Sequence, residues 1–361
     1  MITRRVWLQV AVYLLALTAI IGGRGWGLAR AMGGQYRVTS LLLDVLAVGL
    51  VILTLRLADA GLKAAVRRLL GQASRTRRVV GRAVHAVILV GLGLPFLLIA
   101  FQMHPQRIRP VVTPKDVGLA YTPVTLAADG LRLAAWHIAA AAPDRPVVLI
   151  AHGFNANKAN FLVPAVLVHQ LGYDAFMFDF RAHGDSDGFL STFGFVEARD
   201  VKAAHDWIRG RYPARPVYAL GYSMGGAAVI RAAAEYGIFD AIVLDSTFGS
   251  LEAVARATLL RPFGPLAGWL WHGGRFWAWV GTGLDLDQHR PARHVAALTD
   301  RPLLLVHGTG DSLIPHAESV RLHALAGRGA ALWLVEGAEH VQSVDHPAYR
   351  GRLQRVFGPP P

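Results

Sequence analysis

The chain has 361 residues, enough for one large domain with an appendage or for two domains. It contains no cysteine, which excludes disulfides, thiolate metal sites and a cysteine nucleophile. The formal charge of +13 is unevenly spread: residues 1–115 hold 16 Lys/Arg against 2 Asp, whereas residues 116–361 hold 21 Lys/Arg against 22 Asp/Glu. Because the basic excess lies between apolar runs, it is typical of membrane flanks and argues against a nucleic-acid partner.

Three long apolar runs come first in the chain. Residues 6–23 and 38–55 are 18 residues long each, and residues 83–106 contain no Asp, Glu, Lys or Arg. About 20 helical residues cross the hydrocarbon core of a bilayer. The pattern predicts an all-α membrane region over 1–110 with a transmembrane helix in each run, the third over 83–103. The alternatives are buried helices of a soluble domain and, for the first run, a cleaved signal peptide.

The loops between these runs predict an orientation. Eight Lys/Arg lie between the second and third runs, and three lie between the first and second. Since cytoplasmic loops carry the excess of Lys and Arg, the eight-charge loop is predicted to be cytoplasmic. Three spans then anchor the protein in a bacterial inner membrane with the C-terminal domain on the extracytoplasmic side. If 38–55 does not span, that domain lies on the cytoplasmic side.

After the linker-like segment 107–118, apolar runs of strand length alternate with longer mixed segments. The runs are 131–138, 146–153, 174–180, 216–223, 241–247, 302–308 and 331–337. Most are apolar at consecutive positions, which is typical of parallel strands covered on both faces. Helical stretches such as 197–209 and 225–235 separate them. The alternation predicts a doubly wound, mostly parallel α/β sheet over 118–357, whose ligands bind beyond the carboxyl ends of the strands.

Ser223 lies at a predicted strand-to-helix turn, within G-Y-S-M-G at 221–225. A turn this sharp brings backbone segments close together and therefore favours glycine beside the serine. The N-terminus of the following helix directs free N–H groups and the positive end of its dipole toward an anion formed there. A serine hydroxyl still needs a base to become a nucleophile at neutral pH.

Candidates for that base and for an orienting acid follow the last two predicted strands. Asp311 comes just after 302–308, and His340 comes just after 331–337. His340 would accept the Ser223 proton and pass it to the leaving group. Asp311 would hold the tautomer of the imidazole and stabilise the imidazolium.

An oxyanion hole is predicted from two backbone N–H groups. The turn A-H-G-F at 151–154 follows a central strand and can direct the Phe154 N–H toward a developing oxyanion. The N–H of Met224, the residue after the serine, would be its partner.

Five motifs resemble those of the α/β-hydrolase superfamily in order and spacing. They are A-H-G-F, D-F-R-A-H-G-D-S-D-G, G-Y-S-M-G-G, V-H-G-T-G-D and E-G-A-E-H, spread over roughly 120–355. The resemblance is to the serine-aminopeptidase-like and dienelactone-hydrolase-like branches. It implies a serine hydrolase with Ser223, Asp311 and His340 as its catalytic triad. No metal or organic cofactor is implied.

Other residues compete for these roles. Asp245 also lies at a strand end and could supply the acid, but the His-Gly-x-x-Asp turn at Asp311 fits the family pattern better. His152 and His307 precede glycines in turns and are predicted to satisfy backbone groups rather than to bind metal. The spacing of the 15 histidines suggests no zinc site.

A helical cap is predicted over about 248–300, with four of the nine tryptophans between 269 and 279. These rings could roof a site for an acyl chain, rest on a membrane interface, or pack within the cap itself.

Together these features predict a membrane-anchored serine hydrolase that cleaves carboxylic esters through an acyl-enzyme on Ser223. The substrate would be a small-molecule or lipid ester, and the lipid bilayer a further partner. The alternatives are a peptidase or amidase with the same triad, and a non-catalytic membrane-bound scaffold. The sequence does not determine the acyl length or the oligomeric state.

Overall fold

The computed structural model describes residues 60, 75–141, 144–327 and 329–358. The chain divides into two compact units, Met1–Leu92 and Gly93–Pro361. All candidate site residues named above belong to the second unit.

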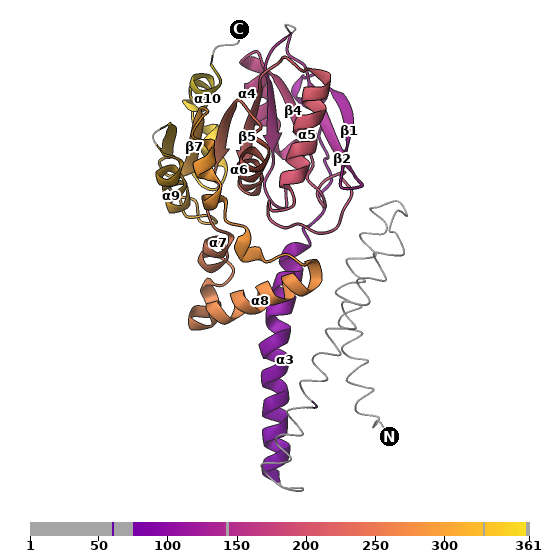
Figure 1. Ribbon diagram of the computed structural model, residues 1–361, viewed down its shortest axis with the longest axis vertical. Helices are drawn as coiled ribbons and strands as arrows, with labels where there is room; N and C mark the ends of the chain where they lie inside the picture. Colours follow the sequence, from indigo (N-terminus) through magenta and orange to yellow (C-terminus); the bar gives the residue numbers. More distant parts are fainter. Residues whose placement is uncertain (1–59, 61–74, 142–143, 328, 359–361) are drawn as a thin grey trace. The chain divides into compact units, whose positions relative to one another are not determined.

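Eight strands form one sheet in the order β1-β2-β4-β3-β5-β6-β7-β8 (Figure 1). The pairs β1–β2 and β2–β4 are antiparallel, and all the others are parallel. This is the mostly parallel α/β sheet that the alternating pattern predicts. The strands are β1 (Thr122–Ala128), β2 (Leu131–Ile138), β3 (Val147–Ala151), β4 (Asp174–Phe178), β5 (Val217–Tyr222), β6 (Ala241–Asp245), β7 (Leu303–Gly308) and β8 (Ala330–Val335).

Helices cover both faces of the sheet, which explains why the central strands are apolar at consecutive positions. In β3, Leu149 packs on one face, whereas Val148 and Ile150 pack on the other. The first face is covered by α5 (Ala198–Arg211), α6 (Met224–Tyr236) and α9 (Ala317–Ala326). The second is covered by α4 (Leu162–Gln170) and α10 (Tyr349–Phe357).

Strand β1 is an element that the sequence interpretation missed. It pairs with β2 through a tight hairpin whose two turn residues, Asp129 and Gly130, have φ of 50° and 78°. Two positive φ values are the requirement of the common two-residue hairpin turn, which favours Asp-Gly. The Asp-Gly dipeptide was therefore the signal in the sequence that could have predicted the hairpin. Strand β1 extends the sheet by one antiparallel strand.

The connection from β6 to β7 is helical, with α7 (Leu251–Ala257) and α8 (Ala267–Thr282). Of the tryptophans on α8, Trp271 and Trp277 are buried, whereas Trp279 is 56% exposed. Helix α8 packs against the last turns of α3 (Arg75–Met103), since a Cβ at Gly273 would lie 2.7 Å from the Cβ of Pro95. The observed role of these two rings is thus packing, in part against α3, where the Phe96 ring lies 5.5 Å from that of Trp277.

Short 3₁₀ helices complete the secondary structure. They are η1 (Pro114–Val117), η2 (Lys158–Phe161), η3 (Arg261–Leu266), η4 (Leu286–Gln288), η5 (Pro291–Arg293), η6 (Val295–Leu298) and η7 (Gln342–Asp345).

The membrane region predicted over 1–110 is not supported. Its first two spans, 6–23 and 38–55, lie outside the described residues. Its third, 83–103, falls within α3, whose last turns pack Leu98 and bury Met103 against an apolar cluster of the hydrolase unit. Over the part of the chain that the structure describes, no helix has both the length and the apolar character needed to cross a membrane.

Candidate active site

Ser223 occupies a sharp turn between two elements. Strand β5 ends at Tyr222, helix α6 begins at Met224, and Ser223 between them has φ 52° and ψ −118°. Such a conformation costs a non-glycine residue roughly 1–3 kcal/mol and persists only where the surroundings enforce it. They do so through close packing: a Cβ at Gly225 would lie 2.3 Å from the carbonyl oxygen of Ala151. Only glycine fits there.

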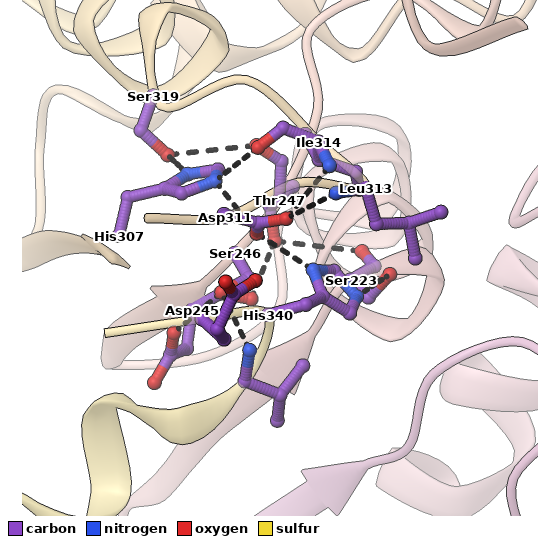
Figure 2. A network of polar contacts seen from close by, with 12 residues as sticks. Ser223, Asp245, Ser246, Thr247, His307, Asp311, Leu313, Ile314, Ser319 and His340 are labelled. Atoms are coloured by element: carbon purple, nitrogen blue, oxygen red, sulfur yellow. Dashed lines mark hydrogen bonds and ion pairs between the residues drawn. The ribbon is translucent and has the colours of Figure 1, made fainter. Parts of the chain in front are cut away.

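The structure brings the three predicted side chains into one hydrogen-bonded row (Figure 2). His340 Nε2 lies 3.1 Å from Ser223 Oγ, and His340 Nδ1 lies 2.7 Å from Asp311 Oδ2. A carboxylate can only accept, so Nδ1 carries a proton in this contact. Neutral His340 therefore presents an unprotonated Nε2 to the serine hydroxyl, which is the tautomer that a general base requires.

Asp311 is held as an anion in a buried setting. Its side chain is fully buried, while that of His340 is 22% exposed. Asp311 Oδ1 accepts the backbone N–H groups of Leu313 at 2.9 Å and Ile314 at 2.8 Å. Burial works against ionisation, but hydrogen bonds from His307 and His340 outweigh it and hold the pKa of Asp311 well below its ordinary value. Asp311 thus stays charged through the neutral range.

Asp245, the competing acid, has a different environment. Its Oδ1 accepts a hydrogen bond from Ser246 Oγ at 3.1 Å, and Ser246 Oγ in turn accepts the N–H of Val341 at 3.1 Å. Burial raises the pKa of Asp245 to about 6. Asp245 therefore supports the backbone beside His340, and it is Asp311 that contacts the imidazole.

The two predicted oxyanion donors belong to the two turns that meet at Ser223. The turn after β3 approaches closely, because a Cβ at Gly153 would lie 3.3 Å from Ser223 Cβ. Phe154 follows in that turn, and its N–H has no acceptor among the described residues. Met224 is the first residue of α6, so its N–H has no intrahelical acceptor.

A buried ion pair braces the turn that carries Phe154. Lys158 at the start of η2 is 2% exposed, and its Nζ lies 2.6 Å from Asp179 Oδ2 in the turn after β4. The backbone N–H of Lys158 also donates to Asp179 Oδ1 at 2.7 Å. The D-F-R-A-H-G-D-S-D-G motif thus supports the candidate oxyanion turn from outside the site.

The sequence interpretation missed the role of His307. Its Nε2 lies 3.1 Å from Asp311 Oδ2, so two imidazoles share one carboxylate oxygen. The available signal was its place at the end of β7, four residues before Asp311, but this spacing is also common in simple turns. His152, in contrast, satisfies backbone groups as predicted, with Nδ1 2.7 Å from Gly153 O and Nε2 accepting from Phe180 N.

Comparison with known proteins identifies the family. A family model described as "alpha/beta hydrolase fold" matches residues 146–273. The protein YfhR of Salmonella typhi, whose function is uncharacterized, is 30% identical over 249 residues, covering 64% of this chain and 76% of its own. The chain belongs to the α/β-hydrolase family.

Two other similar proteins have named activities. The lysophosphatidylserine lipase ABHD12 of Rattus norvegicus is 27% identical to this hydrolase over 201 residues, covering 53% of this chain and 48% of its own. Among solved structures, an esterase of Pyrococcus furiosus is 26% identical with a TM-score of 0.58, covering 71% of this hydrolase and 99% of its own chain.

Within the described residues, no three His, Cys, Asp or Glu side chains are arranged to hold a metal ion.

Proposed function

We propose that this hydrolase cleaves carboxylic esters through an acyl-enzyme on Ser223. The observation that carries the proposal is the hydrogen-bonded row from Asp311 through His340 to Ser223, at a strained turn that opens α6. The esterase and lipase activities named for two similar proteins support the choice of ester over amide.

In the first step, Ser223 Oγ attacks the ester carbonyl carbon while its proton moves to His340 Nε2. The carbonyl π electrons move to oxygen, and the Phe154 and Met224 N–H groups stabilise that oxyanion. Asp311 stabilises the imidazolium that forms. The C–O bond to the alcohol then breaks, and His340 delivers its proton to the leaving alkoxide, which leaves an acyl-Ser223 ester.

In the second step, water replaces the alcohol. His340 takes a proton from water as the water oxygen attacks the acyl carbon, and the same two N–H groups hold the oxyanion. The C–O bond to Ser223 breaks, and the proton returns from His340 to Ser223 Oγ. The carboxylic acid leaves and the enzyme is regenerated.

Covalent labelling tests this proposal directly. Membranes from cells that express the full chain are treated with a fluorophosphonate probe, beside a Ser223→Ala control. We expect labelling that disappears in the control, followed by turnover of p-nitrophenyl esters of graded chain length. A folded protein that takes no label and hydrolyses no ester would contradict the proposal.

The same proposal includes a lipid-like substrate and a membrane anchor. It is supported by the apolar runs at 6–23 and 38–55, which lie outside the described residues, and by the exposed rings on α8, where Phe276 is 47% and Trp279 is 56% exposed. Aromatic rings at a surface favour the interface between water and lipid.

Membrane association is tested by washing membranes with alkaline carbonate. The full chain should stay in the pellet, and its release into the supernatant would contradict the anchor. Protease treatment of intact spheroplasts then tests the proposed extracytoplasmic side: digestion of the hydrolase domain is expected, and protection until the cells are lysed would place it in the cytoplasm.

A further inference from the structure

A second histidine, His307, contacts Asp311 beside the candidate triad (Figure 2). His307, near the end of β7, is fully buried and contacts three groups. Its Nε2 lies 3.1 Å from Asp311 Oδ2 and 2.9 Å from the carbonyl oxygen of Ile314, and its Nδ1 lies 2.7 Å from Ser319 Oγ on α9. Every polar atom of this side chain is therefore engaged.

These contacts determine where the ring carries its proton. Both groups facing Nε2, a carboxylate and a carbonyl, can only accept, so Nε2 must be protonated and donates to both. Nδ1 then accepts from the Ser319 hydroxyl in the neutral ring. Should the ring gain a second proton, Ser319 can turn and donate to the Thr247 carbonyl oxygen, which is 3.5 Å away.

We propose that His307 is a positioning residue for the ester hydrolysis inferred above, and that it extends the row to Ser223–His340–Asp311–His307. It acts on Asp311 Oδ2, the oxygen that also binds His340 Nδ1. The proposal rests on the proposed function for its kinetic consequence, but the geometry of the row stands by itself.

The inferred effect has two parts. First, the Leu313 and Ile314 amides hold Oδ1 while His307 holds Oδ2, so the carboxylate plane is fixed with Oδ2 toward His340. Second, the shared hydrogen bond draws negative charge away from Oδ2, which limits how strongly the carboxylate stabilises the His340 imidazolium.

The charged neighbours of His307 are few. Asp311 in the β7–α9 loop contacts it directly, Asp245 at the end of β6 interacts with it electrostatically, and His340 lies on the far side of Asp311. Its other contacts, Ser319 and the Ile314 carbonyl, are neutral. The pH response of a His307 variant can therefore be ascribed to the Asp311–His340 pair and checked against Asp245→Asn.

The main experiment compares His307→Leu with His307→Gln in the full chain. Leu removes the Nε2 donor, whereas the Gln side-chain amide can place an N–H near the same point. We expect His307→Leu to lower kcat about tenfold, by analogy with the loss of hydrogen bonds that orient metal ligands, with KM nearly unchanged. The acid limb of its kcat/KM profile should move to higher pH, and His307→Gln should restore most of both.

Two further variants separate positioning from stability. Ser319→Ala removes only the partner of Nδ1 and should give a smaller change in the same direction. His205→Leu removes another buried histidine, on α5, which has no contact with the row. It should cost stability without moving the pH profile. A folded His307→Leu with the wild-type kcat and pH profile, or a His307→Gln as impaired as His307→Leu, would overturn the proposal.

A measurement independent of turnover keeps this proposal distinct from the proposed function. Nitrogen-15 NMR of histidine-labelled protein, assigned with the His307→Gln variant, reports which ring nitrogen of His307 is protonated. We expect a protonated Nε2 whether or not the wild type hydrolyses an ester. An unprotonated Nε2 would overturn the extended row even if the enzyme is active, and failure of the wild type to take a fluorophosphonate label would overturn only the esterase proposal.

Discussion

The loops after β7 and β8 and the helical segment between β6 and β7 lie in the same domain but differ in chemistry. In the loops, Asp311 accepts four hydrogen bonds, two from backbone amides and two from histidines. In the helical segment, α8 leaves Phe276 and Trp279 about half exposed. This contrast agrees with the proposed function, in which the polar contacts hold the reacting groups and the exposed rings on α8 meet a lipid-like substrate.

Among the changes that test this contrast, replacing Asp311 should cause the largest loss of activity. In Asp311→Asn, the amide NH₂ would face the Nδ1–H of His340 and the Nε2–H of His307, so donors would oppose donors unless His340 changes tautomer. We expect kcat for a soluble ester to fall on the order of 10⁴-fold, as in comparable triads, with the fold retained. Steady-state kinetics with circular dichroism as the folding control measures this. A loss below tenfold would contradict the assigned role.

A methyl group at Gly225 should break the turn itself. A Cβ there would lie 2.3 Å from the Ala151 carbonyl oxygen, a backbone atom that cannot turn aside. We expect Gly225→Ala to destabilise the domain by about 3 kcal/mol and to impair activity. Gly210→Ala on α5, where a Cβ meets nothing within 4 Å, is the control and should stabilise slightly. Urea denaturation compares the two, and equal stability would refute the packing argument.

The buried carboxyl group of Asp245 should lower the stability of the folded protein when it ionises. Its pKa is about 6 when folded against an ordinary value of 3.8, so the folded state binds more protons over this interval. Its contribution to stability is therefore greatest below about pH 4 and is lost as pH rises toward 6. Asp245→Asn should raise stability at pH 7.5 by about 1–3 kcal/mol and flatten the pH dependence between 4 and 6.

Denaturation at several pH values measures this change, with Asp206→Asn on the surface of α5 as the control. If Asp245→Asn destabilises the protein at pH 7.5, its hydrogen bond to Ser246 matters more than the buried charge.

Changes on α8 should have the smallest effect and should depend on the substrate. Phe276→Ser combined with Trp279→Ser removes exposed apolar area. Transfer of that area from water into lipid would stabilise the bound state by about 1–2 kcal/mol. We expect about tenfold lower kcat/KM for a long-chain ester in vesicles and no change for a short soluble ester. Tyr236→Ser, another exposed aromatic at the end of α6, is the control. Equal loss on both substrates would indicate a folding defect instead.

Much of the fold was predictable because its signals are local. Consecutive apolar residues between helical stretches predicted seven of the eight strands, and the central strands β3, β4, β6 and β7 are indeed buried at every position. Strand β1 was not predicted because it lies at the edge of the sheet and buries only Leu126 and Ala128, so it lacks a run of consecutive apolar residues. The Asp129-Gly130 turn was the signal that could have found it.

The candidate site was predictable in its members but not in all its contacts. Residues after neighbouring parallel strands must meet at one edge of the sheet, so Ser223, Asp311 and His340 could be grouped from their positions. The same argument also admits Asp245, because β6 and β7 are neighbours. Loop conformation separates the two: Asp311 contacts His340, whereas Asp245 accepts a hydrogen bond from Ser246. Ser246 Oγ in turn accepts the backbone N–H of Val341.

The serine turn could be predicted from the chain alone, because glycines flank Ser223 and a strand changes to a helix within a few residues. The role of His307 depends on the packing of the fold, since the loop and helix that follow β7 bring Asp311, Ile314 and Ser319 around one imidazole. The packing likewise decided that Trp271 and Trp277 are buried while Trp279 is exposed. A side chain's neighbours across space depend on how distant segments pack, and no local pattern encodes them.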